Sequence, residues 1–206
     1  MQEQFDFDKD FVLEDNCVLL RPLSQDDATI LHEFANNDPD LWKYSLTPAN
    51  GVVNMNKYIN AALAGRKQST EYPFIVFDKR TQEYAGSTRF YEIQLNHQTL
   101  LLGYTWYGKK FQGTGLNLHS KYLMLQFAFE KMDMSRVEFR ADANNSQSIA
   151  AMKKIGCKVE GILRSNMKKT DGSRRDSIVL SILKDEWMEG VKSALEIQIK
   201  KIPSSK

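Results

Sequence analysis

The chain has 206 residues, of which 42% are hydrophobic, and its 28 basic and 26 acidic residues leave a net charge of +2. This length and composition fit one domain with a core of its own. The near balance of charge gives no general attraction to nucleic acid or to an anionic membrane, so any basic binding site must be local.

Two features bear on the cellular setting. Cys17 and Cys157 lie far apart and form neither a metal-ligand spacing nor a disulfide framework, which favours a reduced, cytoplasmic setting. The polar, acidic N-terminal stretch is unlike a secretory signal or a transit peptide. The apolar runs are far shorter than the ~20 residues that span a bilayer. We therefore expect no membrane and no nucleic acid as partner.

The first predicted elements are one strand and two helices. Residues 17–23 are β-rich, with Pro22 near their end. Ser24, followed three residues later by Asp27, indicates the start of a helix that runs to about Asn36. Asn50-Gly51 predicts a break, and residues 54–66 carry the apolar stripe of a second helix.

The remaining pattern alternates strands and helices. The predicted strands are 72–78, 84–93, 99–107, 135–141, 157–163 and 177–183, and the predicted helices are 116–132, 146–155 and 185–199. Short polar turns join the first three of these strands, which indicates an antiparallel meander. One strand–helix–strand crossover follows. This order predicts an α+β fold, with a mixed, mostly antiparallel sheet flanked by helices.

The turn before the 116–132 helix, KKFQGTG at residues 109–115, carries two glycines and two lysines and has no acidic residue. A helix start offers unpaired N–H groups and the positive end of the helix dipole, and glycine lets the backbone approach a ligand closely. Gly113 and Gly115 therefore suggest a site for phosphate oxygens. A tight strand-to-helix turn with solvated lysines is the alternative.

Three phosphate-binding motifs are candidates for this turn. The Walker P-loop fails because Leu116 stands where lysine is required. The dinucleotide fingerprint fails because Leu118 stands where a third glycine or alanine belongs, and the upstream meander also disagrees with that fold. The third possibility is a site for the pyrophosphate of coenzyme A.

Three sequence blocks, in the right order, carry a resemblance to a known family. Lys110-x-x-Gly113-x-Gly115 resembles the [Q/R]-x-x-G-x-[G/A] motif of GCN5-related N-acetyltransferases (GNAT). The blocks Asn145-Ser-Gln-Ser148 and Met152-Lys-Lys-Ile-Gly156 to Arg164 are similar to the ribosomal-protein-alanine N-acetyltransferase branch, as are Leu20-Arg-Pro-Leu23 and Asp171-Gly172…Asp176…Glu186-Trp187. The resemblance implies an N-acetyltransferase domain at 17–188, an N-terminal extension at 1–16, and a C-terminal helix and tail at 189–206.

The resemblance also implies the GNAT acyl-CoA N-acyltransferase fold, with acetyl-CoA as co-substrate and no metal. In this family the strand before the turn splays from the next strand, and the pantetheine arm lodges in the gap. The implied cofactor-binding residues are Thr105, Trp106, Tyr107, Gln112, Gly113, Thr114, Gly115, Leu116, Asn117, Asn145, Ser148, Met152 and Lys153.

The implied catalytic residues are Ser148, Asn145 and Glu92. Ser148 would protonate the leaving thiolate, and Asn145 would hydrogen-bond the pantetheine arm, although both residues are also good helix caps. Glu92, Asp176 and Glu160 are the candidates for the general base. Attack by an already neutral amine, or proton loss through water, would need none of them.

The resemblance thus implies direct transfer of acetyl to a primary amine in a ternary complex. The acceptor would be a protein N-terminus or an amine-bearing small molecule, and the protein would be a monomer or a homodimer. Trp42, Tyr44 and residues 54–66 fall where the family walls its acceptor groove, and a place in the core is the alternative for the aromatic residues among them. A CoA-binding module without turnover is the alternative, and a Rossmann-type oxidoreductase is a more distant one.

Three further features of the sequence have an interpretation. Cys157 stands where the family usually has phenylalanine, which alters packing more than chemistry. No motif places His32, His97 or His119, and each is interpreted as a surface or packing residue. The charged tip at residues 168–175 is interpreted as a solvated hairpin, and steering of an acidic acceptor by its charges is the alternative.

Overall fold

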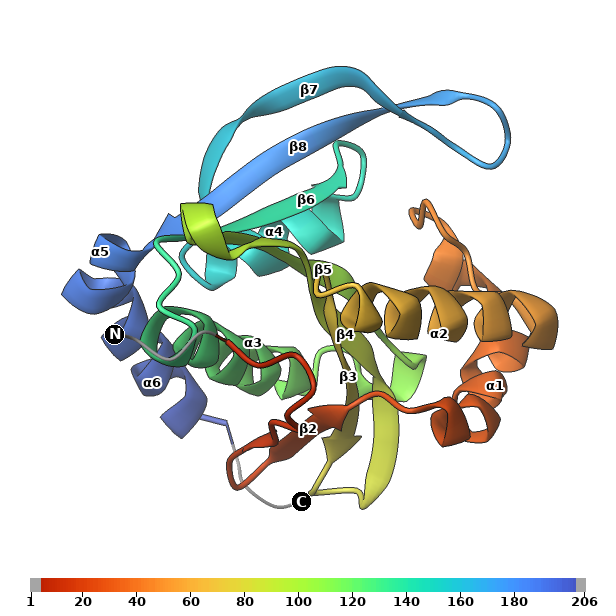
Figure 1. Ribbon diagram of the computed structural model, residues 1–206, viewed down its shortest axis with the longest axis horizontal. Helices are drawn as coiled ribbons and strands as arrows, with labels where there is room; N and C mark the ends of the chain where they lie inside the picture. The colour runs from red at the N-terminus through yellow and green to blue at the C-terminus, as the bar shows by residue number, and fades with distance from the viewer. Residues whose placement is uncertain (1–4, 203–206) are drawn as a thin grey trace.

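The computed structural model describes residues 5–202; residues 1–4 of the predicted extension and residues 203–206 of the predicted tail lie outside the described residues. The described residues form one sheet of eight strands in the order β1-β2-β3-β4-β5-β6-β8-β7 (Figure 1). Neighbouring strands pair antiparallel except β5 and β6, which pair parallel. The predicted mixed, mostly antiparallel sheet is confirmed.

The strands are β1 (Leu13–Glu14), β2 (Val18–Pro22), β3 (Tyr72–Asp78), β4 (Glu83–Gln94), β5 (Thr99–Tyr107), β6 (Arg136–Asp142), β7 (Lys158–Lys168) and β8 (Arg174–Leu183). The α-helices are α1 (Ala28–Asn37), α2 (Gly51–Lys67), α3 (Leu116–Gln126), α4 (Ser146–Lys154), α5 (Lys184–Glu186) and α6 (Lys192–Lys200). A π-helical turn over Phe127–Lys131 continues α3, and another over Trp187–Val191 joins α5 to α6. None of the helices in the described range is long and apolar enough to cross a membrane.

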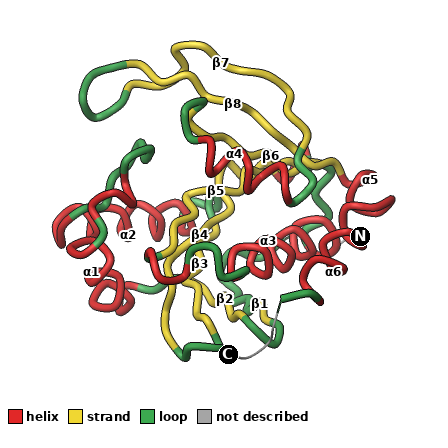
Figure 2. Tube along the Cα trace, turned by 180° about the vertical axis from the view of Figure 1, so that it is seen from behind, coloured by secondary structure: helices red, strands yellow, loops and turns green. Residues whose placement is uncertain are grey.

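Helices cover both faces of the sheet because its central strands are apolar on both sides. On β3, Phe74 and Val76 belong to the core cluster that contains the apolar side chains of α3, and Ile75 between them belongs to the cluster that contains those of α1 and α2. Successive side chains of a strand point to opposite faces, so this alternation requires two apolar layers. Figure 2 shows α1 and α2 on one side of the strands and α3 with α6 on the other.

The parallel pairing of β5 with β6 is short. It joins Thr99, Leu100 and Leu101 to Arg136, Val137 and Glu138 and then ends. Beyond this point β5 carries a bulge opposite β4, because the register shifts between Ser87↔Trp106 and Arg89↔Gly103. Tyr104, inside the bulge, has φ of +49°. Figure 1 shows β6, β7 and β8 leaning away from β3, β4 and β5.

Most differences from the predicted elements lie at their ends. The Ser24–Asp27 pattern is confirmed as a helix start, with Asp27 Oδ2 accepting the Ser24 N–H at 2.8 Å, but a 3-10 turn over Gln25–Asp27 precedes α1. The break predicted at Asn50-Gly51 is confirmed, because Asn50 is extended and Gly51 has φ of +75°, but α2 begins at Gly51, three residues before the predicted start. The π-helical turns divide the helices predicted at 116–132 and 185–199.

The β7–β8 hairpin is longer than predicted. Its pairing reaches Met167↔Arg175 and Lys168↔Arg174, close to the charged tip. β7 is exposed along almost its whole length, so charged residues are tolerated there and no buried alternation marks the strand in the sequence.

Residues 5–14 are packed against the domain. The ring of Phe5 stacks with that of Phe11 at 5.3 Å between centroids and meets that of Phe127 edge-on at 6.0 Å. Tyr72 Oη donates to the Lys9 carbonyl at 2.6 Å. From residue 5 onward, the predicted N-terminal extension therefore contributes to the core.

Trp187 offers a test of the packing beneath α3. It is fully buried, it stacks on Phe129 at 5.6 Å between ring centroids, and its Nε1 donates to Glu130 at 3.0 Å. We expect Trp187→Ala to lower the free energy of unfolding by about 3–5 kcal/mol in urea titrations. Its exposed neighbour Met188 gives the control, since Met188→Ala should stay within ~0.5 kcal/mol of the parent. A loss below about 1 kcal/mol for Trp187→Ala would contradict this account of the core.

Candidate active site

The glycine turn presents free main-chain donors at the start of α3. Gly113 and Gly115 have φ of +73° and +89°, which favour glycine over other residues. The main-chain N–H groups of Gly113, Thr114, Gly115 and Asn117 donate to no acceptor within residues 5–202. Such a row of donors at the positive end of a helix dipole suits phosphate oxygens.

Arg80 binds a carbonyl of this turn. Its Nη1 donates to the Thr114 carbonyl at 2.9 Å, and its Nη2 donates to Asp78 Oδ2 at 2.7 Å. Burial raises the pKa of Asp78, but the hydrogen bonds from Arg80 outweigh it and hold the pKa below its ordinary value. The Arg80–Asp78 pair therefore occupies a carbonyl of the turn and leaves the N–H groups available.

The predicted pyrophosphate-binding residues differ in exposure. Gln112 and Gly113 are exposed, Thr114, Gly115 and Asn117 are half-buried, and Leu116 is buried in the core. The lysines beside the turn are exposed, and Lys110 Nζ lies 2.6 Å from Glu83 Oε1. The fixed hydrogen-bond donors of the turn are therefore its main-chain groups rather than these lysines.

The predicted pantetheine-lining residues Thr105, Trp106 and Tyr107 end β5. The Trp106 side chain is buried in the core beneath α1 and α2, and that of Tyr107 is buried in the core beneath α3. Only main-chain groups of these two residues can face a ligand. Thr105 is half-buried, and its Oγ1 accepts a hydrogen bond from Lys121 Nζ at 2.6 Å.

Asn145 and Ser148 meet at the start of α4. Asn145 Oδ1 accepts the Ser148 N–H at 3.0 Å, so the capping role of Asn145 is confirmed. Ser148 is half-buried, and its Oγ has no hydrogen-bond partner among the described residues. Further along α4, Met152 is buried in the core and Lys153 is exposed. The Ser148 hydroxyl is thus free to serve a ligand.

The three candidate bases have different surroundings. Glu92 is exposed near the end of β4, has φ of +48°, and lies 3.8 Å from Arg140. Asp176 is exposed and accepts the Ser165 N–H at 2.7 Å, and its carbonyl accepts the N–H of Ala143, near the start of α4. The structure brings neither carboxylate into hydrogen-bond contact with Ser148.

Glu160 is engaged in a strong ion pair. Both of its carboxylate oxygens accept hydrogen bonds from Arg136, and Ser181 Oγ donates at 2.5 Å. The Arg136 guanidinium outweighs partial burial and lowers the pKa of Glu160 to about 2. Such a carboxylate is a poor general base at neutral pH, so this candidate is corrected to a structural one.

An aromatic and cationic cluster lies on the α2 side of the β5 bulge. The Arg89 guanidinium stacks over the rings of Tyr104 and Tyr58, at 3.8 and 4.6 Å from their centroids, and pairs with Glu71 at 2.5 Å. Tyr58 Oη donates to the Tyr104 carbonyl at 3.2 Å. The Tyr104 side chain remains 37% exposed. The sequence pattern did not single out this cluster.

Two residues of the predicted acceptor side are buried. Trp42 is 6% exposed and packs edge-on against Trp106, so it belongs to the core. Arg175, assigned to a solvated hairpin, is 8% exposed and turns inward, which lowers its pKa. Neither burial has a local sequence signal, because each depends on an element distant in the chain.

The cysteines and histidines have structural surroundings. Both cysteines are buried free thiols, and burial raises the pKa of Cys157 to about 12, so its thiol is neutral and unreactive near neutral pH. His119 is buried, and its Nδ1 lies 2.5 Å from Asp15 Oδ2. Donor atoms of Asp15, Cys17 and His119 lie within 4.8 Å of one another. The contact between Asp15 and His119 joins the segment before β2 to α3.

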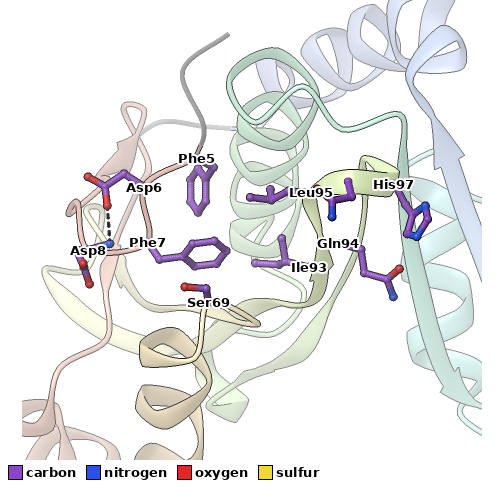
Figure 3. A pocket seen from close by; sticks show the side chains of 10 residues that line it. Phe5, Asp6, Phe7, Asp8, Ser69, Ile93, Gln94, Leu95 and His97 are labelled. Carbon is purple, nitrogen blue, oxygen red and sulfur yellow. Dashed lines mark hydrogen bonds between the residues drawn. The ribbon is translucent and has the colours of Figure 1, made fainter. Parts of the chain in front are cut away.

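A cavity of about 580 Å³ lies elsewhere, between residues 5–8 and the turn at residues 93–97. Figure 3 shows Phe5 facing Leu95 and Phe7 facing Ile93 across it. None of the predicted site residues lines this cavity. Its size alone therefore does not mark the site, and the free donors of the glycine turn are the better guide.

Residues 18–158 match the family model described as "Acetyltransferase (GNAT) domain". An uncharacterized N-acetyltransferase, p20, of Bacillus licheniformis is 26% identical over 82% of this chain and 93% of its own length. The spermidine N(1)-acetyltransferase of Escherichia coli K12 is 23% identical over 83% of this chain and 88% of its own length.

Solved structures are similar over most of the chain. A GCN5-related N-acetyltransferase from Brucella melitensis superposes with a TM-score of 0.84 at 22% identity, covering 93% of this chain and 86% of that one. Mycobacterium smegmatis RimJ in complex with CoA-disulfide superposes with a TM-score of 0.74 at 18% identity, covering 92% and 93%. At these identities the superpositions establish the fold.

The contribution of the Glu160–Arg136 ion pair to stability can be tested by changing the pH. The depressed pKa of Glu160 means that the pair stabilises the fold above about pH 4.5, and that this contribution is lost as the pH falls toward 2. Because the Glu160 side chain is 40% exposed, solvent screening limits its contribution to about 1 kcal/mol at most. Glu160→Gln should therefore lower the free energy of unfolding by about 0.5–1 kcal/mol at pH 7, and by less at pH 3.

Urea titrations at the two pH values measure this difference. Glu189→Gln, at an exposed glutamate on the helix after β8, is the control and should change neither value. A Glu160→Gln deficit that grows on acidification would contradict the depressed pKa.

Proposed function

Because the chain belongs to the GNAT acetyltransferase family, we propose that it moves the acetyl group of acetyl-CoA to a primary amine by direct attack in a ternary complex. One observation carries the proposal: the main-chain N–H groups of Gly113, Thr114, Gly115 and Asn117, where α3 begins, have no partner within residues 5–202. These donors fit the diphosphate of coenzyme A without any side-chain charge.

The remaining contacts follow from the same placement. Main-chain groups of residues 105–107 would line the pantetheine arm beyond the end of the β5–β6 ladder. The Asn145 amide would hydrogen-bond that arm, since its Nδ2 donates to no other described residue. Ser148 stands one helical turn further, and this spacing suits a role nearer the thioester.

The chemistry requires two proton movements. The amine nitrogen forms a bond to the thioester carbonyl carbon, and the tetrahedral intermediate then breaks its C–S bond. The attacking nitrogen loses a proton, and the leaving thiolate gains one. Ser148 Oγ–H would supply the second proton, directly or through water, and such a donor typically contributes 10²- to 10⁴-fold in rate.

The first proton would pass to Glu92 or Asp176, or to water. Glu160 is excluded as the base by its ion pair with Arg136. Glu92 reaches Arg140 only at 3.8 Å, and Asp176 accepts the Ser165 N–H through one oxygen, so both keep a carboxylate oxygen available.

A protein N-terminal α-amine is the acceptor class that we favour. The side of the bulge that bears Tyr104 holds the guanidinium groups of Arg89, Arg140 and Arg175. Within residues 5–202, Arg175 makes no hydrogen bond to a carboxylate, although the charge of Asp142 acts on it. Glu71 and Glu138 neutralise Arg89 and Arg140, which leaves Arg175 to bind an acceptor group. A peptide brings one ammonium and several carbonyl acceptors for such a guanidinium, whereas a polyamine brings no hydrogen-bond acceptor.

Ser148→Ala tests the proposed acid. We expect kcat to fall about 100-fold while the Kd for acetyl-CoA changes less than ~2-fold, because the hydroxyl acts after binding. Steady-state thiol release and calorimetry give the two numbers, and Ser193→Ala, an exposed helix serine on α6, is the control. Unchanged kcat in Ser148→Ala would remove the acid assignment.

An amine panel tests the acceptor. With acetyl-CoA saturating, we expect kcat/KM for short peptides with free N-termini to exceed that for spermidine by at least about 10-fold. Faster turnover of spermidine would overturn the preference for peptides. A thermal midpoint raised by acetyl-CoA, together with no turnover of any amine, would favour the alternative, a CoA-binding module without catalysis.

A further inference from the structure

Lys121 is a lysine on the core face of a helix. It follows Leu118 by three residues and precedes Leu125 by four, so it lies on the same apolar stripe of α3. Lys121 is 6% exposed. A lysine at a position of the apolar stripe predicts a buried lysine, and a buried lysine needs a polar partner inside the core.

The partners of Lys121 are hydroxyl groups. Its Nζ donates to Thr105 Oγ1 at 2.6 Å and to Thr88 Oγ1 at 3.3 Å, and the two hydroxyl oxygens lie 2.7 Å apart. Lys121 makes no salt bridge within residues 5–202. The titratable group that acts on it is the thiol of Cys157, which burial keeps neutral.

Burial without a counter-charge disfavours the ammonium form. It lowers the pKa of Lys121 to about 7, against a weak opposing effect of Cys157. A neutral amine can donate to one threonine hydroxyl and accept from the other. An ammonium in the same place would lose its hydration with only hydroxyl groups to replace it.

The two threonines lie on either side of the β5 bulge. Thr88 is the β4 residue at which the register shifts, and Thr105 follows Tyr104, the bulged residue with positive φ. Lys121 therefore ties α3 to both strands at the place where β5 has left β6. The same helix presents the free N–H groups at its start, five residues earlier.

We propose that Lys121 is a positioning residue for acetyl-CoA. The side-chain amine of Lys121 holds Thr105 and Thr88, and it thereby fixes the main chain of β5, against which the thioester arm binds. This inference rests on the proposed function, since it takes residues 105–107 as the wall of the cofactor site. Lys121 sets the geometry of the wall and takes no part in bond making.

A pH dependence follows from the neutral amine. Near pH 8 the amine holds both hydroxyls. Near pH 6 it is protonated, and the buried ammonium favours opening of the contact between α3 and β5. The advantage of the parent protein over a variant without the amine should therefore shrink on acidification. Ionisation of the coenzyme A phosphates affects both proteins and cancels in the ratio of their Kd values.

The experiment measures the Kd for acetyl-CoA by calorimetry at pH 8 and pH 6, without an acceptor amine. Lys121→Met keeps the length and the apolar stem of the side chain and removes the amine. We expect it to weaken binding at least about 10-fold at pH 8 and less than about 3-fold at pH 6, with a thermal midpoint at or above that of the parent. Lys131→Met, at an exposed lysine further along the same chain segment, should match the parent.

Thr105→Val gives a second route to the same contact. It removes the nearer of the two hydroxyls that Lys121 contacts and leaves the lysine in place, so it serves even if Lys121→Met folds poorly. We expect a similar loss of affinity at pH 8, and little additional loss when the two changes are combined, because they remove one interaction.

The outcomes separate this inference from the proposed function. If the parent protein binds no acetyl-CoA, the proposed function fails, and this inference fails with it. If the parent binds acetyl-CoA and both variants bind equally well, or if the Kd ratio between Lys121→Met and the parent is the same or larger at pH 6, only the role of Lys121 is overturned.

Discussion

The end of the β5–β6 ladder is the constraint on which the rest of the candidate site depends. These two strands pair parallel over three residue pairs and then separate, while β5 bulges against β4 at Tyr104. Main-chain groups freed from a ladder need other partners, so a strand that leaves its neighbour inside a domain offers hydrogen bonds to a ligand. The helix that follows this strand begins at the glycine turn, so both sets of free groups come from one continuous stretch of chain.

Charge at this site comes mainly from the backbone. The lysines beside the glycine turn are exposed, and one of them is paired with Glu83, whereas four N–H groups at the start of α3 have no partner in the described range. Arg80 occupies the opposite side of the turn through a carbonyl. Because backbone geometry fixes these donors, binding a ligand there costs no side-chain entropy.

Two buried basic side chains lie near the bulge. Arg89 is stacked between two tyrosines and paired with Glu71, while Lys121 is held by hydroxyl groups alone. The desolvation of such groups is unfavourable, so their partners fix them in one arrangement. Lys121 lies on the α3 side and Arg89 on the α2 side, and between them they hold the β5 main chain from both faces of the sheet.

The sequence by itself determined the order of the elements, the mixed sheet and the glycine turn before α3, because periodicity, glycine spacing and cap residues are local properties of the chain. Asn145 as a cap and Gly113 and Gly115 at positive φ were readable in this way. The burial of Arg175, the pairing of Glu160 with Arg136 and the contact of Lys121 with Thr105 were decided only by the tertiary structure. Each of these joins residues that are distant in the chain, and the partner of a charge sets its protonation and its role, so no local pattern could have assigned them.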